Sequence, residues 1–395
     1  MNQALSGVRV LDLSRVLAGP WATQMLGDLG ADIVKIEKPG VGDDTRGWGP
    51  PWHGEGEDRR AGYYLAANRN KSSVTIDIAQ PDGQALIRRL AEQSDILVEN
   101  FKRGGLGKYG LDFAALKATN PKLIYCSITG FGQNGPDADK PGYDLMIQAM
   151  SGFMSITGDA EGPPQRMGVA MVDLTTGMNA AAAILAALYQ RERTGRGQHI
   201  DIALFDVALS SLGNQALNYL VSGTPPGRTG NAHPNVVPYQ PFETADGWLI
   251  VAVGNDAQFA RFAELAGHPE MVGDERYRTN AARVENRDTL IPPLVEAMER
   301  RTSVQWTEAL TAANIPYGPI NTIAQAFAEP QARHRGLSGT IGNVPAVASP
   351  LRLSDSPPPE PSAPPALGAQ TEKVLIERLG LSPDEIAELR AAGTI

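Results

Sequence analysis

The sequence predicts an α/β protein with a large domain around a doubly wound parallel sheet and a smaller α+β domain. Short apolar runs alternate with amphipathic stretches through the first half of the chain, which is the pattern of βαβ units. A segment rich in Gly, Pro and Asn follows at 222–238. The 395 residues exceed what one hydrophobic core usually supports, so a second domain is expected after this segment.

Short apolar runs predict the strands of the large domain. They cover 8–13, 32–37, 74–78, 96–99 and 123–128, and residues 199–206 are expected to be a strand that leads into a helix. Amphipathic patterns predict helices at 21–29, 81–92 and 113–118. A Gly- and Ala-rich stretch at 176–192 has almost no charge until its end, which predicts a helix buried on most sides.

Composition also predicts the domain boundaries. The large domain is expected at 1–221, a linker at 222–238, and the small domain, with a strand at 248–253 and several helices, at 239–327. Residues 328–365 include a proline-rich stretch and are expected to form an extended return linker. The C-terminal segment 366–395 is expected to be helical and to pack back on the large domain. Within it, Ser382 as N-cap and Pro383 at the first position predict a helix at 383–391.

Charge and cysteine content argue against several classes of protein. The formal net charge of -9 and the lack of a basic run argue against nucleic-acid binding. The five histidines are scattered and the single cysteine, Cys126, lies in an apolar run typical of a core, so no metal site is expected. The N-terminus lacks signal-peptide features, and the longest apolar run, 180–188, is too short to span a bilayer. A cytoplasmic protein without a membrane partner is therefore expected.

Asp173 is the best single candidate for chemistry. It lies between an apolar run and a predicted helix start. One interpretation is a helix N-cap, a position that favours aspartate. The other is a carboxylate nucleophile, which the helix dipole and backbone N–H groups would hold ionised and which would need no general base. The residues alone leave both interpretations open.

Basic residues recur around the predicted strand ends and loops of the large domain. They are Lys35, Lys38, Lys71, Lys102, Arg103 and Lys108. Singly each fits a solvated surface charge, whereas together they could bind phosphate groups despite the acidic chain. The stretch 105–110 has the letters of a dinucleotide fingerprint, but it follows its strand too late and opens no helix. It therefore predicts a turn.

A series of short segments runs in order through nearly the whole chain. They are Ala18-Gly19-Pro20, Asn68-Arg69-Asn70-Lys71-Ser72, Pro141-Gly142-Tyr143-Asp144 and Thr194-Gly195-Arg196-Gly197-Gln198, together with 7–13, 30–37, 95–101 and 128–132. Taken together, they resemble the class III CoA-transferase family of the CaiB/BaiF type. That family includes formyl-CoA transferase, carnitine CoA-transferase and the related alpha-methylacyl-CoA racemases.

The resemblance implies a Rossmann-like large domain, a small domain and an interlocked homodimer. It also implies that Asp173 is the catalytic nucleophile, that coenzyme A is a substrate, and that no cofactor is tightly bound. A loop with Gly254, Asn255 and Asp256 is implied to close over the active site. The residues that the resemblance implies to bind CoA are Val16, Leu17, Ala18, Lys38, Ile76, Asp77, Ile78, Ala79, Asn100, Phe101, Lys102, Lys108, Pro141, Gly142, Tyr143 and Asp144.

The activity implied by the resemblance is transfer of CoA from an acyl-CoA to a free carboxylic acid through an aspartyl-CoA thioester. The stretch 230–242 and the pair Gly247-Trp248 look most like members that use succinyl-CoA and dicarboxylates. His233 is either a contact for a distal carboxylate or a linker histidine. The racemase branch has a histidine where this chain has Tyr143, and a tyrosine is poorly suited to exchanging α-protons near neutral pH. A transferase is therefore preferred, and a racemase-type isomerase is the alternative.

Overall fold

The computed structural model describes residues 3–56 and 59–395, which form two compact units. The first unit comprises the chain up to Phe153, Met167–Ser222 and Gln331–Ile395. The second comprises Met154–Arg166 and Gly223–Pro330. Residues 154–166, which the sequence placed in the large domain, join the second unit through contacts with the segment after 222. For example, the Arg228 guanidinium donates to the Gly162 carbonyl at 2.6 Å.

Six parallel strands form the main sheet of the first unit. Numbered along the chain, their spatial order is 3-2-1-4-5-6, the doubly wound order of Rossmann-like folds. The predicted parallel sheet is confirmed, and its order reverses between the third and fourth strands in space, where such folds bind ligands. In spatial order the strands are β5 (Lys71–Thr75), β2 (Asp32–Glu37), β1 (Arg9–Asp12), β6 (Ile96–Glu99), β7 (Ile124–Thr129) and β8 (His199–Ala203).

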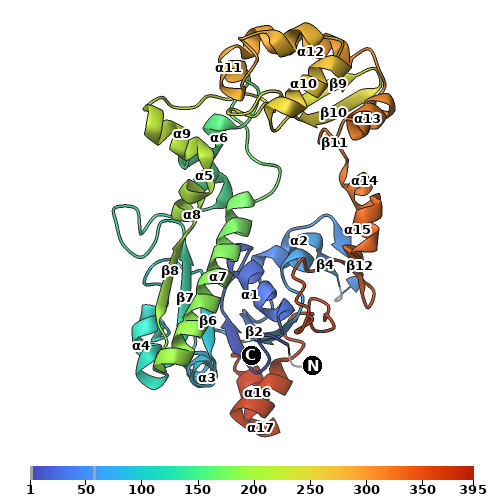
Figure 1. Cartoon of the computed structure of the whole chain (residues 1–395). Coiled ribbons are helices and arrows are strands. Elements are labelled where there is room, and N and C mark those ends of the chain that lie inside the picture. Colours follow the sequence, from blue (N-terminus) through green and yellow to red (C-terminus); the bar gives the residue numbers. More distant parts are fainter. Residues whose placement is uncertain (1–2, 57–58) are drawn as a thin grey trace. The chain divides into compact units, whose positions relative to one another are not determined.

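Helices cover both faces of this sheet (Figure 1). Alternate residues of each strand point to opposite faces, so Val10 and Leu11 of β1 belong to two different apolar cores. Cys126 lies fully buried in the first core, which confirms its predicted position, and burial raises the pKa of its thiol. The helices at the first core are α1 (Ala18–Asp28), α7 (Met171–Thr194) and α8 (Leu204–Ser211). Those at the second are α3 (Pro81–Glu92), α4 (Phe113–Thr119), α16 (Thr371–Leu379) and α17 (Pro383–Ala391).

The C-terminal segment contacts the edge strand β5. The Thr371 hydroxyl accepts a hydrogen bond from the Thr75 N–H at 2.9 Å. Figure 1 shows the red helices α16 and α17 beside the blue N-terminal part of the chain. Ser382 caps α17 in a capping box with Glu385, and the helix begins at Pro383 as predicted.

Shorter elements complete the first unit, and α6 and α15 cross into the second. At 105–110 the chain forms a single 3-10 turn that ends at Gly110 with φ 64°, which confirms the predicted turn. The shorter elements are η1 (Asp44–Gly47), β3 (Trp52–His53), β4 (Arg60–Ala61), α2 (Gly62–Ala66), η3 (Gly107–Tyr109), α5 (Asp144–Met150), α6 (Phe153–Ile156), α9 (Asn214–Ser222), α15 (Pro330–His334), β12 (Ser338–Ile341) and β13 (Val344–Val347).

The second unit has its own antiparallel sheet and its own core. Phe242, Phe262 and Trp306 are buried in this core, in agreement with the predicted α+β domain. The strands, in spatial order, are β11 (Tyr317–Pro319), β10 (Gly247–Ala252) and β9 (Tyr239–Thr244). The helices are α10 (Asp256–Leu265), η4 (Pro269–Gly273), α11 (Asn280–Glu285), α12 (Arg287–Met298), α13 (Ser303–Ala312) and α14 (Ile323–Ala328).

Helix α7 is longer than the sequence predicts, because it begins at Met171 rather than at 176. Its 24 residues are long and apolar enough to cross a membrane, although the run 180–188 had argued against any span. The buried residues Val172, Gly177 and Ile184 pack among α1, α8 and the sheet, which is the arrangement of a core helix. Length and composition are therefore weak evidence for a membrane span here.

Gly177 allows α7 to approach α1 closely. A Cβ atom at this position would lie 2.7 Å from the Ala18 carbonyl oxygen and 3.0 Å from the Trp21 Cβ atom. Any larger residue must push the two helices apart, since neither contact can be relieved by rotating a flexible side chain. The crossing therefore fixes the start of α7 against the start of α1.

Replacing Gly177 by alanine should lower the free energy of unfolding by about 1–3 kcal/mol, because the added methyl group separates α7 from α1. Urea unfolding followed by circular dichroism would detect this as a lower midpoint. Gly47→Ala is the matched control, since a Cβ atom there meets nothing within 4 Å. An equal decrease in the free energy of unfolding in both variants would contradict the proposed steric overlap between a Cβ atom at position 177 and α1.

Candidate active site

A cavity of about 490 Å³ opens at the carboxyl edge of the main sheet, where the strand order reverses. Its walls come from the segments after β1, β6 and β7 and from the start of α7. Many residues that the resemblance had implied therefore meet in one place. Those that line the cavity are Val16, Leu17, Ala18, Ile78, Asn100, Phe101, Lys102, Lys108, Pro141, Gly142, Tyr143 and Asp173.

A second cavity of about 360 Å³ lies along the same edge, over β2 and β5. Predicted residues Lys38, Ile76 and Asp77 line it, and Ile78 lines both cavities. Arg15 and Phe101 are also shared, so the two cavities adjoin. Neither cavity is lined by the predicted residues Ala79 and Asp144.

Asp173 is the third residue of α7, and its side chain lines the larger cavity. The N-cap interpretation is wrong, since the N-cap is Ala170, which makes no side-chain capping bond. Another helix supplies the missing acceptor. Asp144, the first residue of α5, accepts hydrogen bonds from the N–H groups of Val172 at 2.8 Å and Asp173 at 3.2 Å.

The expectation that Asp173 is held firmly ionised is also wrong. Burial and then the neighbouring Asp144 carboxylate raise the pKa of Asp173 from 3.8 to about 7. The helix start does not offset this, because Asp144 already accepts its first N–H groups. A carboxyl group that titrates near neutral pH and faces a cavity is typical of an active site.

The other two aspartates of the cavity wall differ from Asp173 in having cationic partners. Asp44 pairs with Arg15 at 3.1 Å, and Asp139 pairs with Arg103 at 3.2 Å. Within residues 3–56 and 59–395, no Lys or Arg forms an ion pair with Asp173. Asp173 is therefore the cavity carboxylate that remains available to a substrate.

The basic residues noted in the sequence divide into two groups. Lys35 and Lys71 have fully buried side chains that pair with Asp43 at 2.9 Å and Asp12 at 3.1 Å, so the expectation that they bind phosphate is wrong. Exposed Lys102, Arg103 and Lys108 line the larger cavity, and Lys38 the smaller one. Of these, Arg103 is paired with Asp139.

Asn100 lines the larger cavity and also holds part of its wall, while the CoA contact that the resemblance implied for it stays a prediction. Its carboxamide accepts from the Arg15 N–H at 2.9 Å and donates to the Arg15 carbonyl at 2.7 Å. These two bonds join the end of β6 to the loop after β1, across the reversal in strand order. Asn100 therefore lines the cavity while its polar atoms hold the neighbouring wall.

Two glycines allow the segment at Pro141 to cross the end of β7. A Cβ atom on Gly130 would lie only 2.6 Å from the Cα atom of Gly142. Tyr143 follows at the N-cap of α5 and is 65% exposed. This crossing brings Asp144 to the start of α7.

The remaining predicted site residues lie in the second unit. Asn255 caps α10 by accepting from the Gln258 N–H, and Asp256 pairs with Arg283 at 2.8 Å. The Gly254 N–H donates to the Gln258 side chain. That this segment closes over the active site stays a prediction.

His233 also belongs to the second unit. Its Nδ1 accepts from the Asn235 N–H at 3.1 Å, and its ring contacts Tyr239. These contacts fit a histidine with a local structural function. A substrate contact for His233 stays a prediction.

Comparison with known proteins identifies the family. Residues 5–371 match the model of CoA-transferase family III. The chain belongs to this family. The resemblance seen in the sequence is therefore confirmed.

Similar proteins carry the same activity in their names. Over 387 residues the chain is 50% identical to the succinate–glutarate CoA-transferase of Agrobacterium fabrum, covering 94% of this chain and 95% of that one. It is 43% identical over 396 residues to the succinyl-CoA:glutarate CoA-transferase of Homo sapiens, covering 99% and 90%. Among solved structures, a CAIB/BAIF family protein from Brucella suis is 48% identical with a TM-score of 0.86, covering 96% and 100%. The protein is thus a CoA-transferase that acts on acyl-CoA and carboxylate substrates.

The sequence did not predict every residue that lines the larger cavity of this CoA-transferase. Arg15 follows the carboxyl end of β1, where doubly wound folds bind ligands, so its position was a usable signal. Asp44, Asp139 and Lys140 had no such signal, because Asp44 begins the short helix η1 and the other two lie in the loop before α5, and only the tertiary structure brings them to the cavity.

The raised pKa of Asp173 predicts a pH-dependent effect of Asp173→Asn. Because the pKa is about 7 in the folded protein and 3.8 ordinarily, the folded state binds this proton more tightly, so stability is lost progressively as the pH rises from 3.8 to about 7. Asp173→Asn should therefore raise the melting temperature by several degrees more at pH 8 than at pH 5.

Thermal unfolding at the two pH values measures this difference. Asp206→Asn is the matched control, because Asp206 is the exposed third residue of α8, as Asp173 is the third residue of α7. The control should change stability by less than about 0.5 kcal/mol at either pH. Equal shifts for Asp173→Asn at pH 5 and pH 8 would contradict the raised pKa.

Proposed function

We propose that this enzyme transfers CoA from succinyl-CoA to a dicarboxylic acid through a covalent thioester on Asp173. One observation carries the proposal: among the described residues, Asp173 is the cavity aspartate without a cationic partner, whereas Asp44 and Asp139 are paired with arginines. A carboxylate nucleophile must be free to form a bond with carbon. The names of the Agrobacterium and human relatives support succinyl and glutaryl groups as substrates.

The proposed reaction begins with attack of an Asp173 carboxylate oxygen on the thioester carbonyl carbon. The C–S bond breaks, and a mixed anhydride and the CoA thiolate are formed. The thiolate then attacks the Asp173 carbonyl carbon and releases the donor acid as a carboxylate. Asp173 is left as a thioester of CoA, and no external base, oxidant or metal is consumed.

The second half repeats these steps with the acceptor. An oxygen of the acceptor carboxylate attacks the Asp173 thioester carbonyl, which gives a second anhydride and the CoA thiolate. The thiolate attacks the acceptor carbonyl carbon, so the new acyl-CoA forms and the Asp173 carboxylate is restored. Water must be kept from both anhydrides, and the partly enclosed position of Asp173 favours this.

The cavities offer positive charge to the phosphates of CoA. Lys102 and Lys108 lie on the wall of the larger cavity, and Lys38 lies on the smaller one. In the described parts of the chain, Lys102 and Lys108 form no ion pair with an acidic side chain. In this proposal they bind the phosphates, because the strongest contacts to phosphate oxygens are made by charged donors.

Replacing Asp173 by alanine should reduce transfer from succinyl-CoA to glutarate by roughly 1000-fold or more, since the nucleophile is removed. Product acyl-CoA would be quantified by mass spectrometry, with malate, oxalate and formate as further acceptors. Asp206→Ala is the control and should retain activity, because Asp206 is exposed and lines neither cavity.

The same assay tests the covalent step. After incubation with succinyl-CoA, hydroxylamine should convert the activated Asp173 carboxyl into a hydroxamate in the unmutated enzyme. Transfer by Asp173→Ala at the unmutated rate would refute the nucleophile. Loss of α-deuterium from a 2-methylacyl-CoA without any acceptor acid would instead indicate the racemase-type alternative.

The proposal includes a homodimer in the cytoplasm. Helix α9 exposes apolar side chains that are 55% exposed at Leu217, 70% at Leu220 and 84% at Val221, which favours burial against a second copy of the chain. Light scattering during gel filtration should give twice the chain mass of 42.1 kDa. A monomer at micromolar concentration would contradict the dimer without affecting the proposed chemistry.

A further inference from the structure

The loop between β1 and α1 forms one wall of the larger cavity and is held by side chains from other strands. Lys35 of β2 donates to the Ser14 carbonyl at 2.8 Å. Asn100, directly after β6, binds both the N–H and the carbonyl of Arg15. Nucleotide-binding Rossmann folds commonly use glycines to shape this loop. Here the buried side chain of Lys35 and the half-buried side chain of Asn100 hold the loop.

Val16 is the most constrained residue of the loop. Its φ is 71°, in the left-handed region, which a β-branched residue rarely adopts because its side chain crowds the backbone. Its side chain lines the cavity, and it precedes Leu17 at the N-cap of α1. A conformation of this kind persists only when its surroundings enforce it, and such residues cluster at functional sites.

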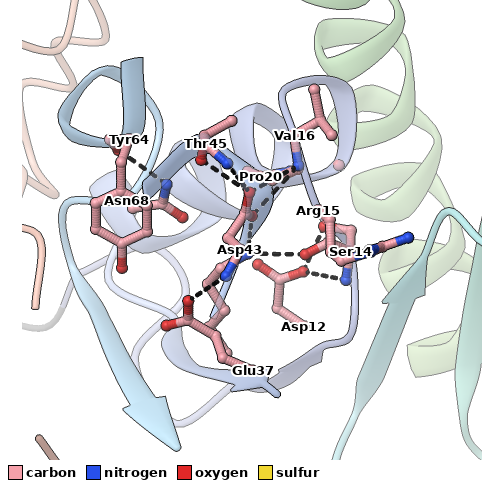
Figure 2. Close-up of polar contacts among 12 residues, drawn as sticks. Asp12, Ser14, Arg15, Val16, Pro20, Glu37, Asp43, Thr45, Tyr64 and Asn68 are labelled. Atoms are coloured by element: carbon pink, nitrogen blue, oxygen red, sulfur yellow. Dashed lines mark hydrogen bonds and ion pairs between the residues drawn. The ribbon is translucent and has the colours of Figure 1, made fainter. Parts of the chain in front are cut away.

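Asp43 enforces the conformation of Val16. Its two carboxylate oxygens accept from the Val16 N–H at 3.2 Å and 3.3 Å. Figure 2 shows Asp43 between Val16 and Thr45, whose N–H and hydroxyl also donate to it at 3.0 Å and 2.8 Å. The Lys35 ammonium lies 2.9 Å away, and both side chains of this pair are fully buried.

The groups that contact the Asp43 carboxylate, from Val16, Thr45 and Lys35, are all donors, and only a carboxylate can accept from all of them. Burial alone would raise the pKa of Asp43, but Lys35 and the Thr45 donors lower it to about 2, so it remains ionised. An asparagine would turn an N–H₂ group toward at least one of these donors. The position is thus specific for charge as well as for shape.

We propose that Asp43 is a positioning residue for CoA binding: it holds Val16 in the left-handed conformation that shapes the cavity wall beside Asp173. Asp43 lines the smaller cavity but not the larger one, and its side chain is fully buried against Lys35, so it acts on the larger cavity through Val16 rather than by touching the substrate there. The proposal rests on CoA binding in this cavity. A purely structural role, in which Asp43 only neutralises Lys35, predicts lower stability without a specific effect on CoA.

The test combines Asp43→Asn with Val16→Gly. Glycine adopts positive φ without steric cost, so a loop with glycine at this position should need Asp43 less. Asp43→Asn alone should raise the Kd for CoA, measured by calorimetry, and the KM for succinyl-CoA by about tenfold, while kcat with glutarate falls less than about threefold. In the Val16→Gly background, the same substitution should raise both constants by less than about threefold.

Ser73→Ala is the matched control within the same buried network. The Ser73 hydroxyl donates to Glu37 at 2.6 Å and does not contact residues 14–16. This variant should lower the melting temperature and leave the Kd for CoA unchanged. Thr45→Val is a milder second variant, because it removes one donor to Asp43 and leaves Lys35 paired. Thr45→Val should raise the Kd for CoA by about threefold, and it takes the place of Asp43→Asn in the test if that variant does not fold.

The proposal would be overturned if Asp43→Asn raised the Kd for CoA equally in the unmutated and Val16→Gly backgrounds. It would also be overturned if the Kd for CoA were unchanged in both Asp43→Asn and Thr45→Val. Those failures differ from failure of the proposed function. If the unmutated enzyme binds CoA but transfers none from succinyl-CoA, the donor is wrong, and the Kd comparison still decides the role of Asp43. If the unmutated enzyme does not bind CoA, both proposals fail.

Discussion

Two buried lysine–aspartate pairs constrain the carboxyl edge of the main sheet. Lys35 of β2 pairs with Asp43, and Lys71 of β5 pairs with Asp12 of β1, in each case with both side chains fully buried. Removing one partner of such a pair typically costs about 3–5 kcal/mol, because the remaining charge has no water to solvate it. These pairs thus hold the edge of the sheet and its loops in one arrangement. Both cavities lie at this carboxyl edge.

The constraint continues from the edge to Asp173 through the packing of two helices. Lys71 also donates to the Pro20 carbonyl in the first turn of α1 at 2.9 Å, which ties that helix to the buried charges. Helix α1 in turn contacts α7 at Gly177, one turn after Asp173. A residue deep in the sheet thereby influences where the candidate nucleophile lies, without any direct contact between them.

Asp43 and Asp173 show how environment separates two carboxylates of the same chain. The Asp43 carboxylate accepts from Val16 and Thr45 and pairs with the buried Lys35 ammonium, and its pKa falls to about 2 despite its burial. Asp173 is half-buried beside Asp144, no lysine or arginine of the described residues pairs with it, and its pKa rises to about 7. The carboxylate of Asp43 is fully used in structural contacts, whereas the oxygen lone pairs of Asp173 remain available for attack on a substrate. This contrast in pKa is a physical basis for assigning their different roles.

Local patterns predicted several elements correctly. The strands at 32–37 and 96–99 and the helix at 81–92 have the bounds that the sequence predicts, because each is an apolar or amphipathic run with polar ends. The strand predicted at 74–78 instead covers Lys71–Thr75. Its first residue looked like a surface charge, and its burial depends on Asp12, which is 59 residues away in the sequence. The start of α7 was misplaced for a similar reason, since its acceptor, Asp144, lies on another helix.

By itself, the sequence determined the fold class, the family and the choice of Asp173 as the candidate nucleophile, because these depend on hydrophobic periodicity and on the order of short motifs along the chain. Only the tertiary structure decided that Lys35 and Lys71 are buried partners of aspartates, that Asn100 holds a loop, and that Asp173 titrates near neutral pH. These properties depend on burial and on charges that distant segments bring together. Electrostatic energy is set by distances in space and by exclusion of water, and neither can be read from positions along the chain.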